Sequence, residues 1–331
     1  MTDMQLVPVT VLTGFLGSGK TTLINYLLEQ HPEEKIAIVE NEFGAVNIDS
    51  ALLKPQTGVE IIELSSGCIC CSVRGELTEA LHDLLSRRDQ GTLKFDRLIL
   101  ETTGLADPAP VVQTFFVDEQ LRERIALDAV VTLVDCEHAN RQMDENRVAV
   151  SQVGFADRLI LTKVDRVDAA AKTKLVERLR KINARAEIIE ADHGRLPRAA
   201  WIDVAAFNLD DALKVDPSFL EKPQDDENEH SWEDNIQSRV YQAGELDIGL
   251  IGNFMEETIE RFGNDMLRYK GIFAIAGEPR RLIVQGVHKV VGFDYGSEWQ
   301  PEETRGSTLV IIGRELPVKD IREGFRACED H

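Results

Sequence analysis

The amino-acid sequence predicts an α/β protein in which a doubly wound, mostly parallel sheet is followed by a second, smaller α+β domain. Up to about Trp201, short apolar runs alternate with amphipathic stretches of helical length, which is typical of a doubly wound sheet. Residues 207–235 lose this periodicity and carry a dense block of acids, as expected of a linker. Beyond them strands and helices no longer alternate, which favours a separate layer. We therefore predict a first domain at 1–206, an acidic linker at 207–235 and a second domain at 236–331.

The predicted strands of the first domain are rich in Val, Ile and Leu with little polar alternation, as expected where both faces of a parallel sheet are covered. They occupy residues 7–13, 35–40, 58–64, 98–102, 129–135 and 159–162, with helices predicted at 20–30, 76–87 and 170–183. In the second domain the predicted strands are 236–242, 266–275, 281–287 and 308–312, and the predicted helices are 248–262 and 318–328.

The composition is that of an acidic globular protein. Of 331 residues, 43% are hydrophobic and 29% are charged, and a formal net charge of −21 argues against a nucleic-acid surface, which needs a basic footprint. No apolar run approaches the roughly 18 residues of a membrane span, and the N-terminus lacks the basic region of a signal peptide. The crowding of three of the five cysteines suits a thiolate site in a reducing compartment better than a disulfide framework. We expect a cytoplasmic protein with no nucleic-acid or membrane partner.

The strongest motif is G-x-x-x-x-G-K-[ST], which spans residues 14–21 between an apolar strand and a helix-forming run. Its glycines let the backbone curl so that several N–H groups face one phosphate, and the following helix adds its positive N-terminal end. We expect Lys20 to reach the β- and γ-phosphate oxygens and the Thr21 hydroxyl to ligate Mg²⁺. The nucleotide-binding residues predicted in this loop are Gly14, Gly17, Ser18, Gly19, Lys20, Thr21 and Thr22.

A second motif, T-K-x-D, follows the predicted strand at 159–162 and comprises Thr162, Lys163 and Asp165. An Asp carboxylate accepts from the guanine N1–H and the exocyclic amine together, whereas adenine presents the opposite polarity at those positions. The Lys163 stem can lie over the face of the base, and Thr162, where Asn is more usual, forgoes one amide contact. The motif therefore favours a guanine nucleotide, and GTP is the predicted ligand.

Two further loops follow predicted strands and carry acids. Glu101 can hold the Mg²⁺ shell through water and the Gly104 N–H can contact the γ-phosphate, which is typical of a segment ordered by a triphosphate. The loop that contains Glu40 and Glu42 is a candidate first switch, able to meet Mg²⁺, water or a second metal. No general base is evident, so a slow intrinsic rate of hydrolysis is expected. The residues expected to act in hydrolysis are Lys20, Thr21 and Glu101.

Cys68, Cys70 and Cys71 follow the predicted strand at 58–64, so we expect them at the sheet edge where the phosphate loop lies. Two or three thiolates from one tight turn can hold Zn²⁺, or Co²⁺ or Ni²⁺ in its place. One short motif cannot complete a tetrahedral cage, so a further ligand such as Glu40 or Glu42 is needed. The alternative is a redox pair or simple packing of the thiols.

Five motifs in this order, GFLGSGKTT, ENEFG, SSGCICC, ETTGLADP and TKVD, closely resemble the CobW-like family of P-loop GTPases and within it the YjiA-type members. The tail segments RYKG, VQGVH and STLVIIGREL resemble that family's C-terminal domain, so the resemblance covers nearly the whole chain. It implies a P-loop NTPase fold, metal-dependent GTP hydrolysis and, in several members, delivery of metal to client enzymes. On that footing Cys68, Cys70 and Cys71 match the metal motif of the family, and Glu40 and Glu42 match its acidic switch. Many members carry a long His-rich stretch that is missing here, so bulk metal storage is not expected.

Taken together, these features predict a GTP-hydrolysing protein that binds a transition metal, most simply zinc, and delivers it to a client metalloprotein. Two alternatives stay open. A P-loop small-molecule kinase or ligase would need an acceptor pocket and an Arg-rich lid, and a regulatory GTPase switch would use its thiols to sense oxidation. The isolated His82, His138 and His193 are expected to be surface or hydrogen-bonded residues rather than ligands.

Overall fold

The structure is a computed structural model that describes residues 6–41, 59–63, 73–206 and 236–330. The chain divides into two compact units, Met1–Leu179 with Ala186–Phe207 and Arg180–Arg185 with Asn208–His331. The predicted acidic linker at 207–235 lies outside the described residues. Among the helices that are described, none is both long enough and apolar enough to span a membrane.

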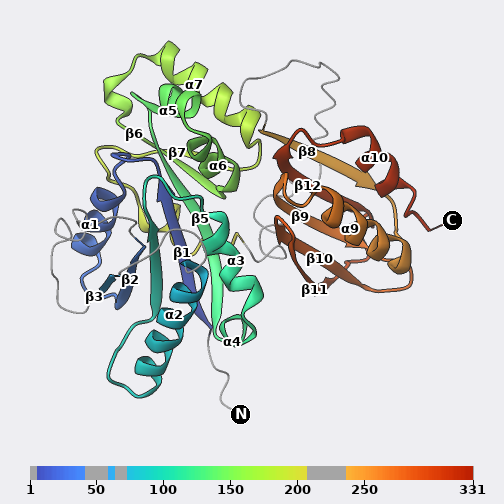
Figure 1. Ribbon diagram of the computed structural model, residues 1–331, viewed down its shortest axis with the longest axis horizontal. Coiled ribbons are helices and arrows are strands. Elements are labelled where there is room, and N and C mark those ends of the chain that lie inside the picture. The colour runs from blue at the N-terminus through green and yellow to red at the C-terminus, as the bar shows by residue number, and fades with distance from the viewer. Residues whose placement is uncertain (1–5, 42–58, 64–72, 207–235, 331) are drawn as a thin grey trace. The chain divides into compact units, whose positions relative to one another are not determined.

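The first unit contains a seven-stranded sheet in which all neighbouring strands are parallel (Figure 1). The strand order is β3-β2-β4-β1-β5-β6-β7, so the chain moves outward from β1 first in one direction and then in the other. This reversal places helices on both faces and confirms the predicted doubly wound sheet. The strands are β1 (Val7–Gly14), β2 (Ile36–Asn41), β3 (Val59–Glu63), β4 (Arg97–Thr102), β5 (Ile125–Asp135), β6 (Arg158–Thr162) and β7 (Glu187–Glu190).

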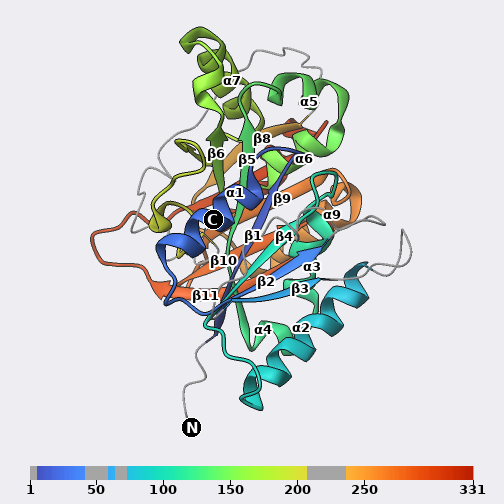
Figure 2. The ribbon, with the colours of Figure 1, turned by 90° about the vertical axis from the view of Figure 1, so that its left-hand side faces the viewer.

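Helices cover both faces of this sheet. Leu23 and Leu27 of α1 pack with Ile38 of β2 and Val131 of β5 in one buried cluster, because they recur at helical spacing on one side of α1. Figure 2 shows β1 and β4 lying between α1 and the pair α2 and α3. The helices are α1 (Lys20–Gln30), α2 (Val73–Asp89), α3 (Ala109–Val117), α4 (Glu119–Arg122), α5 (Ala139–Glu145), α6 (Arg147–Phe155) and α7 (Ala169–Ile182), with short 3₁₀ turns η2 (Val164–Arg166) and η3 (Arg198–Ala200).

Within the second unit, the described residues 236–330 form a five-stranded antiparallel sheet of order β11-β10-β9-β12-β8 with two helices. Ile251 and Met255 of α9 and Phe325 of α10 pack with Tyr269 and Phe273 of β9, so both helices lie on one face of the sheet. The predicted α+β layer is therefore confirmed. Its elements are β8 (Ile236–Ala243), α9 (Ile248–Phe262), β9 (Met266–Ala274), β10 (Arg280–Val287), β11 (Val290–Glu298), β12 (Ser307–Arg314) and α10 (Val318–Arg326).

Helix α9 shows why this part of the sequence folds as predicted. Asp247 precedes it, and its carboxylate accepts hydrogen bonds from the N–H groups of Gly249 and Leu250, both at 2.8 Å. This side-chain cap satisfies two of the N–H groups that the first turn of a helix leaves without a partner. The helix begins at Ile248 and ends at Phe262, as the apolar periodicity predicts.

Two strands were not predicted. β7 is only four residues long, begins and ends with an exposed Glu and lies at the edge of its sheet, so it lacks the apolar run of the other strands. β11 is an edge strand without a buried residue, and it pairs with β10 through a two-residue turn in which His288 adopts a φ of 51°. Neither strand carries the pattern of a buried strand, because neither is covered on two sides.

Candidate functional site

The carboxyl ends of all seven parallel strands lie at one edge of the sheet, and polar residues gather there. Glu40 is the residue before Asn41, the last residue of β2, and Glu101 lies near the end of β4. Asp135 is the last residue of β5 and Thr162 the last of β6, and all four side chains are buried. Because polar groups are buried only where they are paired or bind a ligand, this edge is the candidate site.

The phosphate loop follows β1 at the centre of this edge and has the predicted backbone. Gly14, Gly17 and Gly19 have φ angles of 138°, 73° and 102°, a region that other residues rarely adopt. A Cβ on Gly14 would also lie 2.5 Å from the carbonyl oxygen of Leu133. Helix α1 begins directly after Gly19 with no side-chain cap and no acid in its first turn. The N-cap residue, Gly19, has no side chain that could accept from the first N–H groups of the helix, which suits a helix end that binds phosphate.

Lys20 lies inside this loop. Its side chain is buried, and its ammonium group donates a 3.0 Å hydrogen bond to the carbonyl oxygen of Gly14. This bond holds the positive charge across the loop, where phosphate oxygens would be drawn to it. Thr21 is half-buried and Thr22 exposed on the same turn of α1. A Cβ on Gly194, in the loop after β7, would lie 2.7 Å from the Thr22 methyl carbon, so this unpredicted loop also borders the site.

Two buried carboxylates lie beside the phosphate-loop strand. Glu101 of β4 is in register with Leu12 of β1 on one side and with Glu40 of β2 on the other. Glu63 of β3 is the next register position, opposite Glu40. Carboxylate oxygens together with the Thr21 hydroxyl are the hard donors that Mg²⁺ prefers, so the residues present fit this ion.

The segment after β4 packs directly on the phosphate loop. A Cβ on Gly104 would lie 2.4 Å from the backbone nitrogen of Leu16, so only glycine allows this close approach. The buried Gln152 of α6 donates from its amide to the carbonyl oxygens of Gly104 and Ala106, at 3.3 and 3.1 Å. No sequence motif marks Gln152, which lies far along the chain from the segment that it holds.

The T-K-x-D loop is fastened to the phosphate loop by its first residue. The Thr162 hydroxyl donates to the carbonyl oxygen of Ser18 at 2.8 Å. Lys163 follows with a φ of 53°, in the left-handed region, and Asp165 is exposed in the 3₁₀ turn η2. A threonine at this position therefore joins the two loops, a role that the motif alone does not predict.

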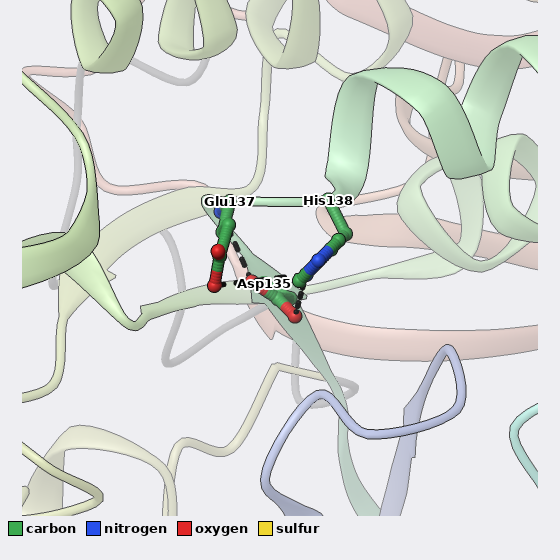
Figure 3. Close-up of side chains that lie close together, drawn as sticks. All are labelled: Asp135, Glu137 and His138. Atoms are coloured by element: carbon green, nitrogen blue, oxygen red, sulfur yellow. Dashed lines mark hydrogen bonds and ion pairs between the residues drawn. The ribbon is translucent and has the colours of Figure 1, made fainter.

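Asp135 lies at the centre of a small polar cluster with Glu137 and His138 (Figure 3). Its carboxylate accepts from the Glu137 N–H at 3.0 Å, pairs with the Nδ1 of His138 at 2.8 Å and accepts from the Lys163 ammonium group at 2.6 Å. Burial opposes ionisation of Asp135, but the hydrogen bonds from Lys163 and His138 outweigh it and hold its pKa below the ordinary value. His138 is thus hydrogen-bonded, as predicted. His82 likewise contacts Asp118, at 3.1 Å.

The thiols separate into two groups. Cys136 and Cys328 are free and buried, and burial together with the neighbouring Asp135 raises the pKa of Cys136 to about 11. Cys136 is therefore protonated at neutral pH. The predicted metal residues Glu42, Cys68, Cys70 and Cys71 lie outside the described residues.

Comparison with known proteins identifies the family. Residues 8–190 match the CobW/HypB/UreG nucleotide-binding domain. The chain belongs to this family. Residues 236–329 match the cobalamin synthesis protein cobW C-terminal domain, so both halves of this CobW-family chain are accounted for.

Its relatives include proteins with a named role. The chain is 42% identical over 326 residues to the zinc chaperone YjiA of Escherichia coli, covering 97% of this chain and 98% of that protein. It is 39% identical over 220 residues to the zinc-regulated GTPase metalloprotein activator 1 of Schizosaccharomyces pombe, covering 64% and 53% of the two chains. The crystal structure of the Zn(II)-bound YjiA GTPase from E. coli matches with a TM-score of 0.77 at 36% identity, covering 99% of this chain and 100% of that one.

Proposed function

We propose that this CobW-family protein binds and slowly hydrolyses GTP, and that the nucleotide cycle controls the binding of zinc and its delivery to a client metalloprotein in the cytoplasm. The observation that carries the proposal is one sheet edge on which the phosphate loop lies beside the buried acids Glu40 and Glu101. The named roles of the relatives, zinc chaperone and metalloprotein activator, support zinc as the cargo. Co²⁺ and Ni²⁺ are the alternatives, because both accept the same mixed donors.

In this proposal each residue of the edge has a separate task. Lys20 binds the β- and γ-phosphates, and Asp165 accepts from the guanine base. Thr21, and Glu101 through water, would hold Mg²⁺, which when bound neutralises charge on the phosphates. The segment with Gly104 responds to the presence of the γ-phosphate, because Gly104 lies against Leu16 of the phosphate loop. Gln152 fixes the position of this segment through its hydrogen bond to the carbonyl oxygen of Gly104.

The coupling to metal follows from the same edge. The segment with Cys68, Cys70 and Cys71 starts where β3 ends and leads to α2, and β3 is three strands from β1 in the sheet order. Three strand spacings amount to about 14 Å, so the register positions of Glu101 and Glu40 lie between the phosphate loop and the start of this segment. A nucleotide-dependent shift of these acids would change metal affinity, and metal would change nucleotide affinity by the same factor.

The first half of the test asks whether GTP is the substrate. GTP and ATP hydrolysis are measured with Mg²⁺ on one preparation of the full chain, and hydrolysis of GTP over ATP is expected. Faster turnover of ATP, or transfer of phosphate to a metabolite, would reject the GTPase assignment.

The second half of the test asks whether zinc is coupled to GTP. Zinc affinity of the wild type and of Cys70→Ala/Cys71→Ala is measured by competition titration with GTP and with GDP. We expect the double variant to lose its tight zinc site, and the wild type to bind zinc differently in the two nucleotide states. Cys328→Ala is the matched control, because that thiol is buried in the second unit. Unchanged zinc affinity in the double variant would reject the metal role.

The proposal also covers the division of the chain into domains. We propose that 1–206 forms the GTPase domain, 207–235 an acidic linker and 236–331 the CobW-type C-terminal domain. The two family matches, at 8–190 and 236–329, support this division.

A further inference from the structure

Two acids at and just after the end of β5 contact two cations, one in the T-K-x-D loop and one directly after it. Asp135 pairs with Lys163, with 2.6 Å between carboxylate oxygen and ammonium nitrogen, and Glu137 pairs with Arg166 at 3.1 Å. Between them, the N–H of Cys136 donates to the carbonyl oxygen of Thr162 at 3.0 Å. We call Asp135 and Glu137 the acidic clamp. Residues 135–137 therefore contact three residues of the segment 162–166, namely Thr162, Lys163 and Arg166.

The two halves of the clamp differ in strength. The Asp135 carboxylate is 2% exposed and Lys163 is 27% exposed, so their pair is shielded from water. Glu137 and Arg166 are 39% and 57% exposed, and such a surface pair contributes little. Figure 3 shows Glu137 and His138 beside the Asp135 carboxylate, and the hydrogen bond from His138 adds to the bond from Lys163. Asp135 is thus the stronger member.

A metal ion is the competing explanation for this cluster, because one ligand atom each from Asp135, Glu137 and His138 lies within 4.8 Å of the others. The charges argue against it. The two carboxylates already face two cations, Lys163 and Arg166, so the group is balanced without an ion. A divalent cation would have to displace the 2.6 Å contact of Lys163 with Asp135.

Lys163 is the residue whose conformation most needs support from its neighbours. It is not a glycine, yet its φ of 53° lies in the left-handed region, which costs energy unless the surroundings impose it. Its neighbour Thr162 is fixed to Ser18 and its ammonium group to Asp135, so both its backbone and the far end of its side chain are restrained. A lysine stem tethered at its tip presents its four methylene groups as a fixed apolar surface. A flat base is the ligand that such a surface fits.

We propose that Asp135 is a positioning residue for base recognition, which holds Lys163 in the conformation that receives the guanine ring. The inference rests on the proposed binding of GTP. Its physical basis is preorganisation: a long flexible side chain that is already ordered loses less freedom when the ligand binds. Asp135 acts through Lys163 and does not itself contact the nucleotide.

The test distinguishes recognition of the guanine base from binding of the phosphates. Affinities for GTP and for inorganic tripolyphosphate, both with Mg²⁺, are measured for the wild type, Asp135→Asn, Lys163→Ala and the double variant. We expect Asp135→Asn to weaken GTP binding by about tenfold, the size of one charge-assisted hydrogen bond. Tripolyphosphate affinity should not change, because it has no base. The double variant should bind GTP no more weakly than Lys163→Ala, since the two residues act as one unit.

Controls distinguish this result from a structural effect. Asp144→Asn removes an acid that pairs with Arg178 at 2.7 Å on the same unit, and it should leave both affinities unchanged. Wild-type GTP affinity in Asp135→Asn, together with weak binding in Lys163→Ala, would overturn the inference. So would the loss of one bound Zn²⁺ per chain from Asp135→Asn without a change in GTP affinity. Failure of the proposed function would instead be visible in the wild type, as equal affinity for GTP and ATP, and the inference would fall with it.

Discussion

Two buried acids lie near opposite ends of β5, and their partners are of different kinds. Asp128, toward the amino end, accepts from the Thr10 hydroxyl at 3.0 Å and from the N–H groups of Asp203 and Ala205 at 2.9 and 2.7 Å, and it lies 3.6 Å from Arg97. These partners are mostly backbone or buried side chain. They fix the segment at 203–205 against the sheet.

Asp135, at the carboxyl end of the same strand, holds side chains that are partly exposed. Lys163 and His138, its two side-chain partners, are 27% and 37% exposed and lie on loops that border the candidate nucleotide site. The same residue type with the same burial is thus a framework residue at one end of β5. At the other end it holds the T-K-x-D loop. The partners decide the role, and in a parallel sheet the ligand-binding loops follow the carboxyl ends of the strands.

The largest expected effect is that of Lys20→Ala, which tests whether the carboxyl edge is functional. The ammonium group lies inside the phosphate loop, where it donates a hydrogen bond to the carbonyl oxygen of Gly14. Its removal should weaken GTP binding on the order of a thousandfold or more, with little change in the free energy of unfolding. Calorimetric titration and urea unfolding measure the two quantities. Lys172→Ala, which removes a surface pair with Glu190, should change neither.

Asp128→Ala tests the acid near the amino end of β5. It should lower the free energy of unfolding and leave GTP affinity unchanged. It leaves the Thr10 hydroxyl, two backbone N–H groups and Arg97 without this acceptor, so roughly 3 kcal/mol of unfolding free energy should be lost. GTP affinity at a temperature where the variant is folded should stay that of the wild type. If Asp128→Ala instead lost GTP binding while keeping its stability, the contrast between the two ends would be wrong.

Gly104→Ala tests the contact between the segment after β4 and the phosphate loop. The added methyl would lie 2.4 Å from the Leu16 nitrogen, so one of the two loops must move. Overpacking of this kind costs about 1–3 kcal/mol, and we expect GTP binding to weaken by roughly tenfold to a hundredfold. Gly75→Ala is the matched control, since a Cβ there meets nothing within 4 Å. Equal GTP affinity in the two variants would show that the close approach of Gly104 to Leu16 does not affect nucleotide binding.

The pH dependence of stability should have opposite directions for Asp135 and Asp128. The pKa of Asp135 lies below its ordinary value, so its stabilisation is fully present above the ordinary carboxyl pKa of about 4 and is lost as pH falls through the lower folded pKa. Burial raises the pKa of Asp128 despite the hydrogen bonds from Ala205 and Thr10. Ionisation of Asp128 therefore costs the folded state more, and stability falls as pH rises through the raised value.

The measurement compares the urea unfolding of the wild type with that of Asp135→Asn and Asp128→Asn over a series of pH values. The stability advantage of the wild type over Asp135→Asn should shrink as the solution becomes more acidic. Relative to Asp128→Asn, the wild type should lose stability as pH rises above about 4. Parallel curves for the two variants would contradict the assigned directions.

Much of the fold could be predicted from local pattern. Strands β1 to β6 and the helices α1 and α9 were predicted because apolar runs, glycines and helix-start signals lie in neighbouring residues. β7 and β11 escaped prediction because each is an edge strand without the apolar pattern that two covered faces impose. The position of the glycine-rich loop between β1 and α1 was predicted, since its motif lies within a few residues of the chain.

The sequence by itself therefore determined the local motifs: a glycine-rich loop before a helix, a T-K-x-D segment after a strand, and acids at strand ends. Only the tertiary structure decided which of them meet. Thr10 and Asp128 are 118 positions apart, Gln152 and Gly104 are 48 apart, and Asp135 and Lys163 are 28 apart. Such pairs depend on strand order and register, which arise from the packing of the whole sheet and not from any short stretch of chain.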